Sequence, residues 1–127
     1  ELNRTLTLPM PADSVDLLCA FSLFTHLLHA ETYLYLAEAF RCLRPGGRVV
    51  MSFLEFAIDD HWAVFAQTVE SQRASTVPHL NQFIERNQIQ TWGRHLGYAD
   101  ASFIDGNTGP WPSGVPLGQS VAILTKA

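Results

Sequence analysis

The sequence has no cluster of basic residues and no long apolar run. It contains 8 Lys and Arg residues against 12 Asp and Glu residues, so its formal net charge is -4 over 127 residues. Proteins that bind nucleic acids or anionic membrane surfaces usually carry a basic patch, and this charge argues against both kinds of partner. No apolar run approaches the ~20 residues that a membrane-spanning helix needs. We therefore expect a globular chain with no nucleic-acid partner and no membrane partner.

Cysteine is also scarce. Cys19 falls in an apolar stretch and Cys42 lies near a predicted helix end, and free thiols of this kind are ordinary core residues in reducing compartments. The 5 histidines are scattered, and no group of residues has the close ligand spacing of a metal site. These patterns predict a cytoplasmic protein with reduced cysteines and no metal. A catalytic Cys–His pair stays open, although no spacing proposes one.

What the sequence does contain is an alternation of amphipathic and wholly apolar segments. Residues 38–53 read EAFRCLRPGGRVVMSF, where an amphipathic stretch meets Pro45 and an apolar stretch follows over residues 48–54. Proline disfavours helical geometry in the residue before it, and the two glycines allow a tight turn. We read this segment as helix, turn and buried strand. A strand that is apolar on both sides is typical of a parallel sheet covered by helices on both faces.

The rest of the chain continues the same order. Strands are predicted at residues 15–21, 48–54, 101–105 and 119–125, and helices at 31–44, around 62–69 and from the cap Asn87 to the stop Gly97. Alternating elements of this kind predict an α/β fold with right-handed crossovers. Because no helix separates the last two strands, we expect three parallel strands plus an antiparallel last strand, with helices on both faces.

Two motifs in this order resemble the C-terminal half of a class I S-adenosylmethionine-dependent methyltransferase. They are LPMPADSVDLLCAFSLFTHL (8–27) and YLAEAFRCLRPGGRVVMSF, which ends at Phe53. In that family a Leu-Pro segment and an S-x-D turn precede the fourth strand, and R-x-L-x-P-G-G precedes the fifth. The resemblance implies a Rossmann-like sheet. It also implies that residues 1–127 form a partial methyltransferase domain with strands four to seven of the family fold.

The sequence departs from the family pattern in its cofactor motifs. There is no G-x-G anywhere, and no acidic residue stands where relatives hold the ribose of S-adenosylmethionine. The resemblance implies S-adenosylmethionine as the cofactor. We expect the 127-residue chain alone to bind it poorly, because the main holders of its ribose and amino-acid ends are missing.

Candidate site residues follow the carboxyl ends of the predicted strands, where open α/β sheets bind ligands. The resemblance places cofactor contacts at Ala20, Phe21 and Ser22, although Phe21 could instead cap the core and Ser22 begin a turn. It makes His26 a candidate catalytic residue, since imidazole can orient an acceptor or take its proton near neutral pH. The alternative is a structural histidine that caps the next helix.

The acceptor is expected to contact Thr25, Glu55, Trp62 and Trp111. Thr25 lies in the short element that lines the acceptor pocket in relatives, and aromatic faces suit apolar or cationic acceptors. Packing in the core or an interface is the alternative role for Trp62, His61 and Trp111. Asp16 lies at the far end of its strand, where a structural role is expected.

The function predicted from this resemblance is methyl transfer to a small-molecule acceptor. Two alternatives stay open: a catalytically silent methyltransferase-like interaction domain, and a nicotinamide-dependent oxidoreductase, whose G-x-G-x-x-G fingerprint is equally absent. We also expect the chain to self-associate. The strand at residues 15–21 has one side without a predicted partner, apart from what residues 2–8 offer, and an open apolar edge invites pairing with another chain.

Overall fold

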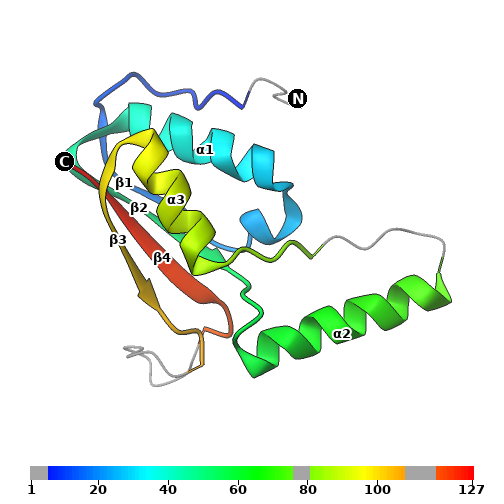
Figure 1. Ribbon diagram of the computed structural model, residues 1–127. Helices are drawn as coiled ribbons and strands as arrows, with labels where there is room; N and C mark the ends of the chain where they lie inside the picture. Colours follow the sequence, from blue (N-terminus) through cyan, green and yellow to red (C-terminus); the bar gives the residue numbers. More distant parts are fainter. Residues whose placement is uncertain (1–5, 76–80, 108–116) are drawn as a thin grey trace.

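The structure is a computed structural model that describes residues 6–75, 81–107 and 117–127 (Figure 1). Its elements, in chain order, are β1 (Val15–Ala20), the short 3-10 helix η1 (Phe24–His26), α1 (His29–Cys42), β2 (Leu43–Phe53), α2 (Asp59–Ala74), α3 (Arg86–Leu96), β3 (Tyr98–Ile104) and β4 (Ser120–Lys126). The predicted alternation of strands and helices is therefore present, and each predicted strand overlaps an observed one.

The four strands form one sheet in the order β1-β2-β4-β3. β1 runs parallel to β2, while β4 is antiparallel to both of its neighbours, β2 and β3. β3 consequently points in the same direction as β1 and β2. The prediction of three parallel strands and an antiparallel last strand is confirmed, and with it the mixed α/β fold.

The boundary between α1 and β2 differs from the sequence prediction. The helix ends at Cys42, two residues before the predicted end, and β2 begins at Leu43 and passes through the Pro-Gly-Gly segment. Gly46 has φ +84°, a left-handed value that side chains disfavour. A Cβ on Gly47 would lie 2.9 Å from the carbonyl oxygen of Arg44, so both glycines are needed for this entry into the strand.

The later helices also differ in their limits. α2 is longer than the predicted stretch around residues 62–69. α3 is capped by Glu85 rather than Asn87, and the Glu85 backbone N–H donates to Oε1 of Gln88 at 2.7 Å. Gly97 ends α3 in a left-handed conformation, as predicted. The cap prediction failed because Glu85 and Gln88 have the same spacing as Asn87 and Gln90.

The core lies between the sheet and the pair α1 and α3, which pack side by side on one face (Figure 1). It is built from aliphatic and aromatic side chains, chiefly Leu36, Leu43, Met51, Phe53, Ile84, Ile89 and Leu124. Tyr98 joins the layers, since its hydroxyl donates to the carbonyl oxygen of Leu36 at 2.7 Å. Burial raises the pKa of the Tyr98 phenol.

α2 extends away from this core, beyond the carboxyl end of β2 (Figure 1). Its first turn is anchored by His61, the one residue of the helix that is fully buried. An aromatic cluster of Phe56, Trp62, Phe65 and Phe83 continues the contact, with the rings of Phe56 and Phe83 stacked at 4.6 Å. Among the described residues, none of the helices has the length and apolar character needed to cross a membrane.

Candidate functional site at the carboxyl edge of the sheet

The carboxyl ends of β1, β2 and β3 and the start of β4 meet at one edge of the sheet. Parallel strands place their carboxyl ends together, and this is where open α/β sheets bind ligands. The predicted residues Ala20, Phe21, Ser22 and Glu55 all lie at this edge. Phe21 exposes 52% of its surface, so it does not cap the core.

Ser22 is held in an uncommon conformation directly after β1. Its φ is +58°, a left-handed value that is rare for residues other than glycine and occurs often at functional sites. Its backbone N–H donates to Oγ of Ser52 on β2 at 2.7 Å. Its own Oγ accepts a hydrogen bond from Nε2 of Gln119, just before β4, at 3.1 Å. Ser22 therefore links three strand ends, and it is more than the start of a turn.

Glu55 lies beyond the end of β2, and only 3% of its surface is exposed. Arg86, the first residue of α3, neutralises it: Nε donates to both carboxylate oxygens at 2.9 and 3.2 Å, and Nη2 donates to Oε2 at 3.1 Å. Nη2 also pairs with Asp105, just after β3. The hydrogen bonds with Glu55, and then those with Asp105, raise the pKa of the Arg86 guanidinium despite its partial burial.

His61 fastens the same region from the first turn of α2. Its Nδ1 accepts the backbone N–H of Glu55 at 3.0 Å, so Nε2 carries the proton and donates to the carbonyl oxygen of Gly118 at 2.7 Å. Only 1% of His61 is exposed. The imidazole thus joins the end of β2, the start of α2 and the approach to β4. This supports the packing alternative for His61.

Thr25 and His26 lie in η1, close to the end of β1. Thr25 is buried, and its hydroxyl donates to the carbonyl oxygen of Ser22 at 3.4 Å. His26 is exposed. The first turn of α1 is capped by Glu31, whose Oε1 accepts the Leu28 N–H at 2.9 Å. Thr25 consequently supports Ser22, and both roles considered for His26 stay predictions.

The remaining predicted residues lie farther out. Trp62 exposes 52% of its surface and packs on Phe56 and Phe65. Trp111 falls outside the described residues. Asp16 lies at the opposite end of β1, where its Oδ2 accepts a hydrogen bond from Nη1 of Arg44 at 3.1 Å, in agreement with its structural role. No cluster of His, Cys, Asp and Glu among the described residues has the arrangement of a metal site.

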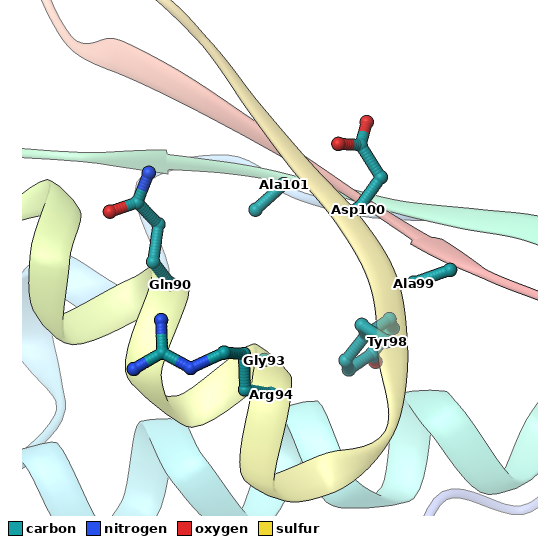
Figure 2. Close-up of a pocket in the computed structure, with 7 residues that line it drawn as sticks. All are labelled: Gln90, Gly93, Arg94, Tyr98, Ala99, Asp100 and Ala101. Atoms are coloured by element: carbon teal, nitrogen blue, oxygen red, sulfur yellow. The ribbon is translucent and has the colours of Figure 1, made fainter.

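Two pockets are candidates for a ligand site, and one of them lies at the carboxyl edge. A pocket of about 590 Å³ opens there, lined by Glu55, Ala57, Ile58, Glu85, Arg86, Asn87 and Asp105. A smaller pocket of about 280 Å³ lies between α3 and the first residues of β3. Figure 2 shows that side chains of α3 and the beginning of β3 form its walls. The smaller pocket is at the amino end of β3, away from the carboxyl edge, so the larger pocket is the better candidate site.

Sequence reasoning missed Arg86, Asp105 and Gln119. The sequence does contain an indication for Arg86. A basic residue in the first turn of a helix interacts unfavourably with the helix dipole, so a compensating acidic partner is expected. For Asp105 the sequence pattern predicts only the end of a strand. Gln119 carried no signal, since its role depends on the approach of β4 to Ser22.

Comparisons with known proteins agree with this geometry. Residues 2–51 match a family described as a methyltransferase domain. No curated protein matches the chain. Among solved structures, a protein of Thermotoga maritima described as an S-adenosylmethionine-dependent methyltransferase and possible histamine N-methyltransferase superposes with a TM-score of 0.65 at 14% identity, over 98% of this chain and 62% of its own.

Two archaeal proteins described as S-adenosylmethionine-dependent methyltransferases are also similar. The protein from Methanosarcina mazei has a TM-score of 0.65 at 10% identity, over 99% of this chain and 66% of its own. The protein from Archaeoglobus fulgidus has a TM-score of 0.66 at 10% identity, over 93% of this chain and 62% of its own. This chain thus spans less than two thirds of the length of each of these relatives.

Proposed function

We propose that the chain supplies strands four to seven of a class I S-adenosylmethionine-dependent methyltransferase domain that methylates a small molecule. Two findings support this proposal: residues 2–51 match a methyltransferase-domain family, and the fold is similar to that of solved methyltransferases. In such a transfer the methyl carbon leaves the sulfonium, whose bonding electrons stay on sulfur as S-adenosylhomocysteine forms. A lone pair of the acceptor forms the new bond, and the acceptor loses a proton. The observation that carries the proposal is the conformation of Ser22 at the carboxyl end of β1, where hydrogen bonds with Ser52 and Gln119 hold it.

The cofactor is proposed to pass Ala20, Phe21 and Ser22. Ser22 is held there by Ser52 and Gln119, so its backbone groups have a fixed direction. The exposed surface of Phe21 adds an apolar contact for a planar ring. These residues fit one side of S-adenosylmethionine only, because the sequence offers no glycine-rich loop for the other side. A chain of 127 residues should therefore bind the cofactor weakly.

The acceptor is proposed to enter the pocket at Glu55 and Arg86. Three carboxylates (Glu55, Glu85 and Asp105) and one guanidinium line it, so these side chains sum to a charge of -2 (-3 + 1). A pocket of this charge suits a small acceptor that carries hydrogen-bond donors or a positive charge. The Thermotoga maritima protein is described as a possible histamine N-methyltransferase, and histamine is a molecule of that kind.

His26 and Trp62 are proposed to meet the acceptor from the two sides of this edge. His26 would orient the acceptor or take its proton, since its imidazole is on the surface of η1. Trp62 would offer an aromatic face, and Trp111 would act with it. Thr25 supports the site indirectly through Ser22. Positioning supplies much of the rate of such transfers, so no single residue is required as a base.

The test uses a longer protein that contains this chain preceded by a cofactor-binding half. It is incubated with methyl-labelled S-adenosylmethionine and a panel of small amines and phenols, and labelled product is counted. Transfer to at least one small acceptor is expected. No transfer to any acceptor, in a protein whose upstream half lacks a glycine-rich loop, would favour the silent interaction domain instead.

A further inference from the structure

The pocket at the carboxyl edge contains more negative than positive charge. It is formed where β2 and β3 end and where α2 and α3 begin, and its lining includes Glu55, Glu85, Asp105 and one guanidinium, Arg86. Arg86 donates three hydrogen bonds to Glu55, which is only 3% exposed. Glu55 is therefore occupied by Arg86, and a ligand in the pocket meets the carboxylates of Glu85 and Asp105 instead.

Glu85 and Asp105 differ from Glu55 in how they are held. Asp105 shares the guanidinium of Arg86 through Nη2, but 41% of its side chain stays exposed. Glu85 is half-buried, and its Oε1 accepts the Phe56 N–H at 3.2 Å. It forms no ion pair with any described residue. The excess negative charge of the pocket therefore lies on these two carboxylates.

Two helix N-termini also lie at this pocket and contribute positive charge. Ile58 and Glu85 are the N-caps of α2 and α3, and a helix N-terminus is equivalent to roughly half a positive charge. The two helix starts together offset about one of the two negative charges that the lining side chains leave. Asp59 and Asp60, exposed in the first turn of α2, add further negative potential beside Ile58. The pocket thus favours a cation over an anion.

We propose that Glu85 and Asp105 bind the ammonium group of the acceptor, and that the methyl group goes to a different atom of the same molecule. This assignment rests on the function proposed above, and it adds the chemical class of the acceptor. Neighbouring carboxylates stabilise the protonated form of an amine. A protonated amine has no lone pair, so the nitrogen that these carboxylates hold is not the atom that attacks the methyl carbon.

The end of β2 sets the separation between the two groups of the acceptor. Ser22, proposed to contact the cofactor, is bonded to Ser52 in β2. Glu55 at the pocket follows Ser52 by three residues, which span at most about 10 Å. The ammonium and the reacting atom lie at the two ends of this stretch. The acceptor is therefore an amine that carries a second nucleophile, such as a phenol oxygen or a ring nitrogen, several bonds from its ammonium group.

The ammonium group stays unchanged during the transfer. A lone pair of the second nucleophile forms the bond to the methyl carbon, and the electrons of the broken carbon–sulfur bond stay on sulfur. The methylated atom loses its own proton to solvent or to His26, while the ammonium keeps all of its protons. Glu85 and Asp105 consequently hold and orient the acceptor, and they determine specificity without taking a proton.

Matched acceptors test the proposal in the longer protein that carries this chain preceded by a cofactor-binding half. Tyramine and para-ethylphenol present the same phenol and differ only in the amino group, and histamine and an ethylimidazole differ in the same way. The KM of each amine should be about tenfold lower than that of its partner, because hydrogen bonds to charged groups are strong. Mass spectrometry should find the methyl group on the phenol oxygen or the ring nitrogen.

The outcomes separate this proposal from the proposed function. Equal KM values within each pair, or methylation of the amino group, would overturn the ammonium site and leave methyl transfer standing. Transfer to none of these four compounds, with transfer to another small molecule, would also overturn the ammonium site alone. Absence of transfer to every small molecule would overturn both.

Glu85→Gln removes the charge and keeps an oxygen that can accept the Phe56 N–H. It should raise the KM for tyramine about tenfold and leave the KM for para-ethylphenol unchanged. Glu70→Gln is the matched control: its side chain is 69% exposed on α2, outside the pocket lining, and neither KM should change. If Glu85→Gln raises both KM values alike, Glu85 has a structural role and the proposal is wrong.

A binding measurement on the 127-residue chain does not depend on transfer. Tyramine at millimolar concentration should shift the amide NMR signals of Glu85 and Asp105, and para-ethylphenol at the same concentration should shift them much less. Glu85→Gln should reduce the shifts that tyramine causes, and Glu70→Gln should not. Equal shifts with the two compounds, or no shifts with tyramine, would contradict an ammonium site in this pocket.

Discussion

The guanidinium of Arg86 makes three hydrogen bonds to the carboxylate of Glu55, between 2.9 and 3.2 Å. This pair joins the end of β2 to the start of α3 and forms one wall of the pocket at the carboxyl edge. Glu55 is almost fully buried, so its carboxylate receives hydrogen bonds from Arg86 in place of water. The stability of the chain and the form of the candidate site are therefore linked through one ion pair.

Arg86→Gln should destabilise the chain by about 3 kcal/mol, because it leaves the buried Glu55 carboxylate without its partner. Urea unfolding followed by circular dichroism measures this loss. Arg94→Gln is the matched control on the same helix: Arg94 is exposed, and its guanidinium donates to Oγ1 of Thr91 at 3.4 Å, so a change within about 0.5 kcal/mol is expected. The double variant Glu55→Gln/Arg86→Gln should recover part of the lost stability. Equal losses for Arg86→Gln and Arg94→Gln would contradict the role given to this pair.

His61→Phe should also destabilise the chain. The substitution leaves the Glu55 N–H and the Gly118 carbonyl oxygen without their partners, and a buried polar group without a partner costs about 1–3 kcal/mol. Urea unfolding of His61→Phe and of His95→Phe, which replaces an exposed histidine at the end of α3, makes the comparison. If both variants unfold at the same urea concentration as the wild type, the His61 bonds to Glu55 and Gly118 do not stabilise the fold.

Because the Tyr98 phenol is buried, we expect the protein to lose stability in alkaline solution. Burial raises the pKa of its phenol above the ordinary value of 10.0. The folded state therefore keeps a proton that the unfolded state loses, and this contribution is complete below pH 10.0 and declines above it. The free energy of unfolding should fall by up to about 1.4 kcal/mol per pH unit from this group. Tyr98→Phe should start less stable, since it lacks the bond to Leu36, and should show a shallower alkaline slope. Parallel slopes for the two proteins would assign the effect to other groups.

The fold could be predicted from the sequence further than the site could. The helix-to-strand boundary near Pro45, the stop at Gly97 and the antiparallel last strand all follow from local patterns, because proline, glycine and the spacing of apolar residues act over a few positions. The exact ends did not follow. β2 takes in Leu43 and the Pro-Gly-Gly segment because Leu43 pairs with Val15 of β1, a contact between distant parts of the chain.

The candidate site depends on contacts of this long-range kind. Glu55 was singled out from its place after a strand, but its partner Arg86 lies 31 residues away and is brought close by the packing of α3. The sequence predicts Ser22 as a cofactor contact, yet its left-handed conformation depends on hydrogen bonds with Ser52 in β2 and with Gln119, just before β4. The binding and catalytic roles of all the predicted site residues stay predictions: Ala20, Phe21, Ser22, Thr25, His26, Glu55, Trp62 and Trp111.

Calorimetric titration with S-adenosylhomocysteine tests the central claim most directly. A longer protein that carries this chain preceded by a cofactor-binding half should bind the ligand at micromolar concentration, and the 127-residue chain alone should show no heat of binding at that concentration. In the longer protein, Ser52→Ala removes the acceptor of the Ser22 N–H and should weaken binding, while Ser102→Ala, at an exposed position on β3, should not. No binding by the longer protein would contradict the methyltransferase account, and tight binding by the 127-residue chain would contradict the placement of the site.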